Sequence, residues 1–278
     1  MKKSVAYGVL LALLPTTTAH SAVLIDITAN DGQSNPTSWG QDPRAGIGES
    51  KEVARDCQWG DIWDNKGVGQ NQARTTITII SGFNLSAGEG GFGLGDIFLN
   101  VGGQIPTSTR PSTSDGYLTY PNPGFNAVVH MTAVVGDRIS YQVALIDDKF
   151  DLQSTYYNQN NGPWRLADVP GGLQTATLTT TVVTMTDSQV INDLGINIGY
   201  SGTSDPNYVA TFDVSQLVSV FGSGASFSGT FDFGCGNDPI WTYGKLGDGI
   251  TPIPETGSCA LGIVGLMILI YQRRRIPS

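Results

Sequence analysis

Runs of β-branched and aromatic residues, partly alternating with polar ones, recur along the chain between short polar segments. The clearest are T-T-I-T-I-I-S at residues 75–81 and A-S-F-S-G-T-F-D-F at residues 225–233. Alternation with a period of two is typical of half-buried strands. We therefore predict strands over residues 23–28, 75–81, 96–101, 127–135, 138–146, 175–185, 208–214 and 225–233.

Helical patterns are short. Residues 49–55 fit a short helix, residues 187–194 a helical turn, and residues 215–221 a helical turn or a strand edge. Residues 30–48 and 106–123 are rich in turn-forming types such as Gly, Pro, Asn, Asp, Ser and Thr, which predicts loops. No helical stretch is long enough to cover a sheet.

Short strands separated by turn signals, without long helices between them, favour an antiparallel architecture. We predict an all-β fold, an antiparallel β-sandwich of the jelly-roll or Ig-like type, with long Gly/Pro/Asn-rich loops. The composition agrees, because 36 of 278 residues are glycine and only 14% are charged. Residues 23–246 are expected to form one domain, the body.

The N-terminus has the pattern of a signal peptide. Lys2 and Lys3 precede an apolar run over residues 5–14, and small residues follow up to Ala22. The run is shorter than the roughly 20 residues of a membrane span. We therefore predict a signal helix over residues 1–22 that is cleaved after export, in preference to an uncleaved anchor.

The C-terminal segment, residues 258–278, has the pattern of a membrane tail. Residues 259–271 are apolar throughout, and an arginine cluster follows. The apolar run partitions into a bilayer, while the arginines stay on the cytoplasmic side because moving them across hydrocarbon is costly. We predict a C-terminal membrane helix followed by Arg273, Arg274 and Arg275.

A linker, residues 247–257, precedes this tail and contains P-I-P-E-T-G. The arrangement resembles the PEP-CTERM tail of proteins handled by exosortases in Gram-negative bacteria. Pro254 and Glu255 match the first two motif residues, whereas Thr256 stands where a second proline is usual. The resemblance implies an inner-membrane intermediate, cleavage by an exosortase-type processing protease, and delivery to the cell surface or extracellular matrix.

Three segments of the body extend the resemblance. They are residues 95–99, residues 209–214, and residues 231–238, which end in C-G-N-D. Such segments resemble parts of exosortase-dependent surface proteins, in which a Cys-Gly-Asn-Asp stretch often ends the body before the sorting tail. The resemblance indicates a cellular location and no particular biochemical activity.

Two other interpretations use the same tail. The stretch I-P-E-T-G differs by one residue from the L-P-x-T-G signal of Gram-positive sortase substrates, which would place cleavage between Thr256 and Gly257. Here the apolar run follows the motif directly, whereas sortase substrates usually have a polar spacer. A plain single-pass anchor is the third interpretation.

Charge and cysteine content fit an exported protein. Without the basic residues of the two terminal signals, ten basic residues stand against 24 acidic ones, a net charge of −14, which disfavours nucleic acid as a partner. Export leads to an oxidising compartment, and Cys259 lies in the apolar tail. We predict a disulfide between Cys57 and Cys235; two unrelated thiols are the alternative.

Candidate catalytic groups are few. His130 is the only histidine outside the signal peptide, and no G-x-S-x-G motif or His/Cys zinc pattern accompanies it. We interpret it as an ordinary strand residue. Asp147, Asp148 and Asp151 follow a predicted strand and could bind calcium, or act as a carboxylate pair in glycoside hydrolysis, but a solvated acidic loop is favoured.

We therefore expect a structural or adhesive surface or matrix protein, without catalysis and without an obligatory cofactor. The alternatives are a carbohydrate-binding module, with or without calcium, a sortase-type wall-anchored protein, and a secreted glycosidase. Extracellular polysaccharide is the partner expected of the binding module.

Overall fold

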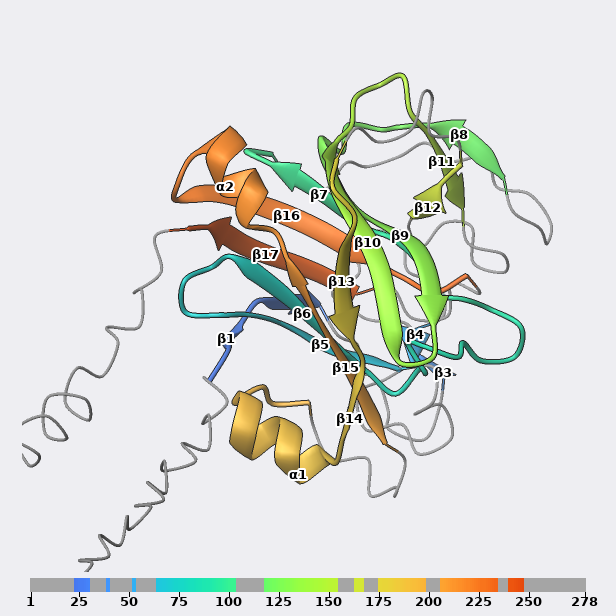
Figure 1. The fold of residues 1–278 in the computed structure, drawn as a ribbon, viewed down its shortest axis with the longest axis vertical. Helices are drawn as coiled ribbons and strands as arrows, with labels where there is room; N and C mark the ends of the chain where they lie inside the picture. The colour runs from blue at the N-terminus through green and yellow to red at the C-terminus, as the bar shows by residue number, and fades with distance from the viewer. Residues whose placement is uncertain are drawn as a thin grey trace, which may run out of the picture.

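The computed structural model describes residues 23–30, 39–40, 52–53, 64–103, 118–154, 163–167, 175–198, 206–234 and 240–247. Within these ranges the protein is mostly β, as predicted, and every strand pair is antiparallel (Figure 1). The predicted signal peptide and membrane tail lie outside the described residues. In the part of the chain that is described, no helix is long and apolar enough to cross a membrane.

A five-stranded sheet has the order β1-β5-β6-β15-β14. Its strands are β1 (Ile25–Asp26), β5 (Asn65–Gln70), β6 (Thr76–Ser81), β14 (Val183–Met185) and β15 (Asn207–Asp213).

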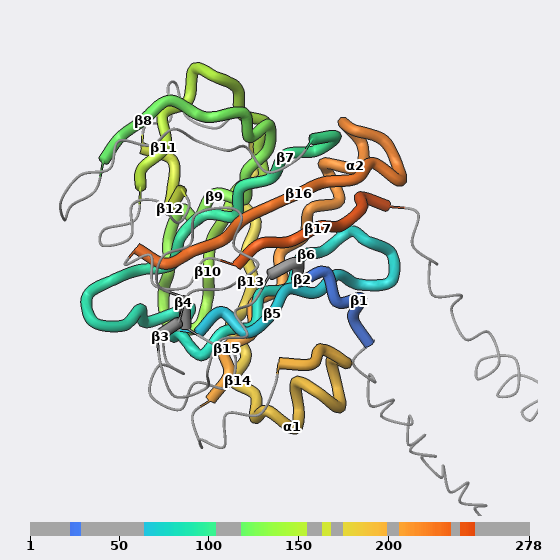
Figure 2. Tube along the Cα trace, turned by 180° about the vertical axis from the view of Figure 1, so that it is seen from behind, coloured from blue at the N-terminus to red at the C-terminus, as the bar shows by residue number. Residues whose placement is uncertain are grey.

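A seven-stranded sheet has the order β13-β10-β9-β7-β16-β17-β2. Its strands are β2 (Thr28–Asn30), β7 (Ile97–Val101), β9 (Ala127–Val135), β10 (Arg138–Leu145), β13 (Leu178–Thr181), β16 (Ala225–Phe231) and β17 (Ile240–Leu246). Figure 2 shows that β2 and β17, from opposite ends of the body, lie side by side.

Smaller elements complete the described fold. A three-stranded sheet has the order β12-β11-β8, and a two-stranded sheet pairs β3 with β4. These strands are β3 (Trp39–Gly40), β4 (Glu52–Val53), β8 (Thr119–Pro121), β11 (Asp151–Ser154) and β12 (Pro163–Leu166). The helical elements are α1 (Asp187–Gln189), the π-helical turn η2 (Val190–Leu194) and α2 (Ser215–Phe221).

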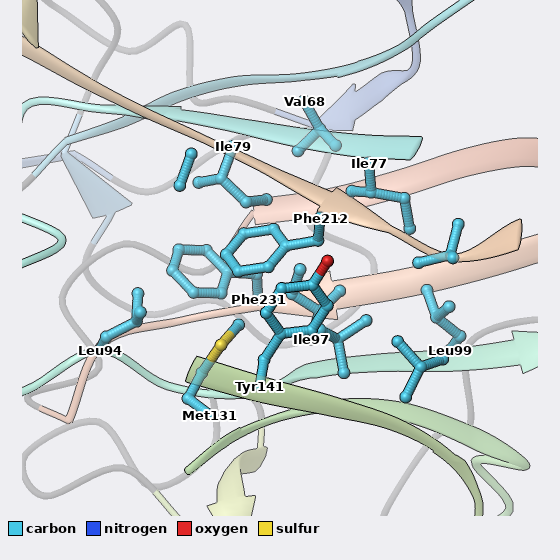
Figure 3. Close-up of a cluster of buried hydrophobic side chains, with 14 of the residues drawn as sticks. Val68, Ile77, Ile79, Leu94, Ile97, Leu99, Met131, Tyr141, Phe212 and Phe231 are labelled. Carbon is cyan, nitrogen blue, oxygen red and sulfur yellow. The ribbon is translucent and has the colours of Figure 1, made fainter. Parts of the chain in front are cut away.

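Side chains from both larger sheets meet in one hydrophobic core (Figure 3). Val68 and Phe212 from the five-stranded sheet belong to the same buried cluster as Leu99 and Tyr141 from the seven-stranded sheet. The rings of Tyr141 and Phe212 meet edge to face, with centroids 5.1 Å apart. Burying each large apolar side chain contributes roughly 1.5–3 kcal/mol, so this shared core is the main source of stability.

A second core lies on the opposite face of the seven-stranded sheet. Along β9, Val129 belongs to the main core, whereas its neighbour Val128 packs with Tyr120 and Leu152 of the three-stranded sheet. Successive residues of a strand face opposite sides, so β9 is buried on both faces at this point. His130 follows Val128 by two and therefore lies on the side of the three-stranded sheet.

Most predicted strands are confirmed, but three local predictions are wrong at least in part. Within the predicted helix at residues 49–55, Glu52–Val53 form a strand paired with Trp39–Gly40, which interrupts the loop predicted at residues 30–48. Thr119–Pro121 likewise form a strand inside the loop predicted at residues 106–123. These strands are two or three residues long, so pairing with a neighbour stabilises them more than any local pattern does.

Candidate functional site

An open groove lies where the first and last strands of the body meet, and we name it the Tyr243 groove. Its volume is about 490 Å³. Residues from β1, β5, β16 and β17 line it, together with Arg74 in the turn after β5. Its polar lining residues include Asp26, Gln70, Arg74, Tyr243 and Lys245.

The floor of the groove depends on a glycine. A Cβ atom on Gly244 would lie 2.5 Å from Cζ of Phe227 and 2.8 Å from Oε1 of Gln70. Real Cβ atoms do not approach other atoms so closely, so only glycine lets the Phe227 ring and the Gln70 amide pack against β17. This close packing holds β17 against the end of β5.

The Gln70 side chain ties the five-stranded sheet to the seven-stranded sheet beside the groove. Its side chain is buried, and Nε2 donates a hydrogen bond of 3.0 Å to the carbonyl oxygen of Lys245. The backbone N–H of Lys245 donates in turn to Oε1 of Gln70 at 3.4 Å. The end of β5 is thus tied to β17, and the Lys245 backbone has a defined position beside the groove.

A tight turn after β5 brings Arg74 to the groove. Arg74 has a left-handed backbone with φ of 54°, and its N–H donates to the carbonyl oxygen of Asn71 at 2.9 Å. Oδ1 of Asn71 also accepts hydrogen bonds from the N–H groups of Thr75 and Thr76, at 2.8 and 3.2 Å. The carbonyl oxygen of Arg74 accepts from the N–H of Gly247 at 3.0 Å, which joins the turn to the chain after β17.

The surface of the groove combines an aromatic ring with charged groups. The Tyr243 side chain is 52% exposed, although its backbone N–H is bound to the carbonyl oxygen of Ile27. Arg74, Lys245 and Asp26 supply two cations and one carboxylate along the same lining. An exposed ring can stack on an apolar face of a ligand such as a sugar, and the charged groups can bind its polar substituents.

The sequence alone does not identify the residues of the Tyr243 groove. Its one indication is that Tyr243 and Lys245 stand two apart in the stretch W-T-Y-G-K and so share one strand face. Gln70 and Arg74 carry no comparable signal, since their part in the groove depends on pairing between distant strands.

His130 lies in a strand, as interpreted, but its ring has a partner that the sequence does not reveal. Nδ1 of His130 lies 2.9 Å from Oδ2 of Asp96, whose side chain is fully buried. The same carboxylate accepts hydrogen bonds from the N–H groups of Met131 at 2.8 Å and Leu166 at 2.9 Å. These contacts join β9 of the seven-stranded sheet to β12 of the three-stranded sheet, a structural role.

The three aspartates considered for calcium lie at the turn between β10 and β11. The Asp147 carboxylate is about half exposed, and it accepts a hydrogen bond from the Lys149 backbone N–H at 2.9 Å and pairs with the Lys149 Nζ at 3.4 Å. The backbone hydrogen bond, helped by the ammonium, lowers the pKa of Asp147 below its usual value. Asp148 is exposed, and Asp151 is half-buried in β11.

These aspartates do not come together as a metal site in the described structure. Among the described residues, no group of three or more His, Cys, Asp or Glu side chains could hold a metal ion. A hollow of about 350 Å³ nearby is lined by Asp147 but by neither Asp148 nor Asp151, and its other lining residues include Leu145 and Phe150.

The remaining predicted site residues lie outside the described residues. They are Cys57 and Cys235 of the predicted disulfide, Pro254, Glu255 and Thr256 of the motif, and Arg273, Arg274 and Arg275 of the tail. Each of these assignments stays a prediction.

Comparison with known proteins adds no family to this geometry. No protein-family model, curated protein or solved structure matches the chain.

Proposed function

We propose that this is an exported protein that serves a structural or adhesive role, without catalysis, at the cell surface or in the extracellular matrix. The observation that carries the proposal is the C-terminal sequence, in which Pro254 and Glu255 precede an apolar run and Arg273 to Arg275. The tail partitions into the inner membrane, with its arginines on the cytoplasmic side. An exosortase-type protease then cleaves near the motif and releases the body.

The body supports this proposal. Its two larger antiparallel sheets share one core, and we propose that they form a β-sandwich of the jelly-roll or Ig-like kind. The predicted bond between Cys57 and Cys235 closes a long loop and would add about 5 kcal/mol in the chain-entropy model.

Replacing Pro254 and Glu255 together by alanine tests the sorting step. We expect the variant to stay in the inner membrane with its tail attached, whereas the wild-type protein reaches the surface without it. Pro252→Ala, in the same linker, is the matched control and is expected to be sorted normally. Intact-mass measurement of the C-terminus gives the readout.

The same measurement separates the alternatives. Cleavage between Thr256 and Gly257 would support the sortase interpretation, and an uncut tail in the wild-type protein would support a plain anchor. Normal surface delivery of the double alanine variant would refute the proposed sorting signal.

A second candidate function is polysaccharide binding in the Tyr243 groove. The observation that favours it is the exposed Tyr243 ring beside the cations Arg74 and Lys245 in an open hollow. The ring stacks on a sugar, and Arg74, Lys245 and Asp26 bind its polar substituents. The protein as a whole is strongly acidic and repels polyanions, so neutral polysaccharides are the preferred class.

Binding to an array of neutral and uronate-containing polysaccharides, with and without calcium, tests this function. Tyr243→Ala is expected to weaken binding about fivefold, for a stacking contribution of about 1 kcal/mol. Val135→Ala, at an exposed apolar residue of the β9–β10 hairpin, is the control and should bind normally. Equal binding by both variants would place the ligand elsewhere.

A further inference from the structure

A lysine, an aspartate and an asparagine meet in the interior at one end of the five-stranded sheet. Lys66 is 2% exposed, Asp187 is 8% exposed and Asn207 is fully buried. Nζ of Lys66 lies 3.9 Å from Oδ1 of Asp187, and Nδ2 of Asn207 donates a hydrogen bond of 2.7 Å to that same oxygen. An amine and a carboxamide therefore converge on one carboxylate oxygen.

The sheet brings these groups together from distant parts of the sequence. β6 lies between β5 and β15, and its Ser81 is opposite Asn65 on one side and Tyr208 on the other. Lys66 is the extra residue of the irregularity between Asn65 and Gly67, and Asn207 immediately precedes Tyr208. Lys66 and Asn207 thus flank the same end of β6.

Asp187 reaches the pair from the first turn of α1. Asn207 is opposite Met185 of β14, so the chain enters α1 directly beside it. A capping box fixes this turn, because Oγ1 of Thr186 accepts from the N–H of Gln189 while Oε1 of Gln189 accepts from the N–H of Thr186. The carboxylate is therefore held in place by local structure.

The Asp187 carboxylate stands beside the Lys66 ammonium and can act as its base. Transfer of one proton from Nζ of Lys66 to Asp187 would turn the ammonium into an amine. The amine so formed is a nucleophile. Oδ1 of Asn207 is buried without a hydrogen-bond partner among the described residues. A half-turn of the amide would place that oxygen against Asp187, whose proton would then polarise the carbonyl.

We propose that Lys66 and Asn207 are joined by an intramolecular isopeptide bond whose formation is promoted by Asp187. Nζ of Lys66 attacks Cγ of Asn207, the new C–N bond forms, and the bond from Cγ to Nδ2 breaks. Asp187 carries two protons in turn from the attacking nitrogen to the leaving nitrogen, which departs as ammonium. The carboxylate of Asp187 ends in the state in which it began.

The bond would link β5 to β15 covalently across β6. It involves no cysteine and no oxidant, and it does not depend on how the protein is sorted. Loss of ammonium to solvent makes the reaction effectively irreversible.

Peptide mapping of the purified full-length protein by tandem mass spectrometry, with two proteases, tests the proposal. We expect one linked species that contains Lys66 and Asn207 and is lighter than its two peptides by one molecule of ammonia. Trypsin is expected not to cut after Lys66. On a denaturing gel, the linked protein should migrate differently from an unlinked variant.

Two variants and a control assign the roles. Lys66→Arg should abolish the linked species because a guanidinium stays protonated. Asp187→Asn should leave Lys66 and Asn207 unlinked in a protein whose far-ultraviolet circular dichroism is still that of a β fold. Lys149→Arg, at an exposed lysine, should leave the link intact.

The wild-type map decides the question even if the variants fail to fold. The wild-type protein is unfolded before digestion, and tryptic cleavage after Lys66 in that digest would overturn the proposal. A linked species that has lost water and contains Asp187 would overturn the assignment of Asn207 as the acceptor.

Discussion

His130 and Asp96 are joined through a 2.9 Å contact between Nδ1 and Oδ2, and Asp96 also accepts two backbone hydrogen bonds. This difference in partners predicts a difference in stability. Asp96→Ala leaves three donors without their acceptor, and each costs about 1–3 kcal/mol, so it should lower the free energy of unfolding by about 3–5 kcal/mol. His130→Ala removes one contact and should cost about 1–2 kcal/mol. Urea unfolding measures both, and equal losses would contradict this assignment.

The contact beneath Gly244 predicts a steric effect. Gly244→Ala places a methyl group 2.5 Å from the Phe227 ring, which must move, so we expect a loss of about 1–3 kcal/mol in the free energy of unfolding. Gly93→Ala is the matched control because a Cβ there meets nothing within 4 Å. A Gly244→Ala variant as stable as the control would show that the groove floor adapts.

Burial of Tyr141 predicts a loss of stability at alkaline pH. Desolvation raises the pKa of Tyr141 above the usual value of 10.0, although its oxygen accepts a hydrogen bond from the N–H of Asp213. Unfolding at a pH between 10.0 and the pKa of the folded state therefore releases a proton, and stability falls as pH rises through that folded-state pKa. Urea midpoints measured from neutral to alkaline pH should fall less steeply for Tyr141→Phe. Identical slopes would contradict the prediction.

In contrast to the alkaline loss expected from Tyr141, the lowered pKa of Asp147 predicts a loss of stability at acidic pH. Its pKa is lowered, so its contribution to stability is present above the unfolded-state pKa and is lost as pH falls through the folded-state pKa. Lys149→Gln should raise the pKa of Asp147 only in part, because the largest cause is the backbone N–H of residue 149, which remains. Carbon-13 NMR titration of the carboxyl group measures this, and a full return to the usual value would show that the ammonium dominates.

The strands that could be predicted are those whose own residues form runs of β-branched or aromatic types. Ala127–Val135 is found with the predicted bounds because apolar and β-branched residues recur along its whole length, and its first half packs on both cores. Asn65–Gln70 (N-K-G-V-G-Q) has no such pattern, yet all six residues are buried. Its pairing with β1 and β6 places it in the sheet, and local propensity does not reveal that.

The candidate sites were less predictable than the fold because they depend on pairing between distant segments of the chain. Asp96 lies in a predicted strand, but its three donors come from two other segments of the chain. Lys66 and Asn207 become neighbours only through the order of the strands around β6. Sequence patterns report burial and periodicity, whereas these contacts depend on topology.

The position of β17 has a mechanical consequence. The strand has a neighbour on each side, β16 and β2, and the chain leaves the body from its end at Leu246 and Gly247. Hydrogen bonds of an antiparallel ladder are perpendicular to the strands. Tension applied to the chain after Gly247 along the strand axis would therefore load both ladders in shear, so that many bonds resist rupture together and do not unzip one at a time.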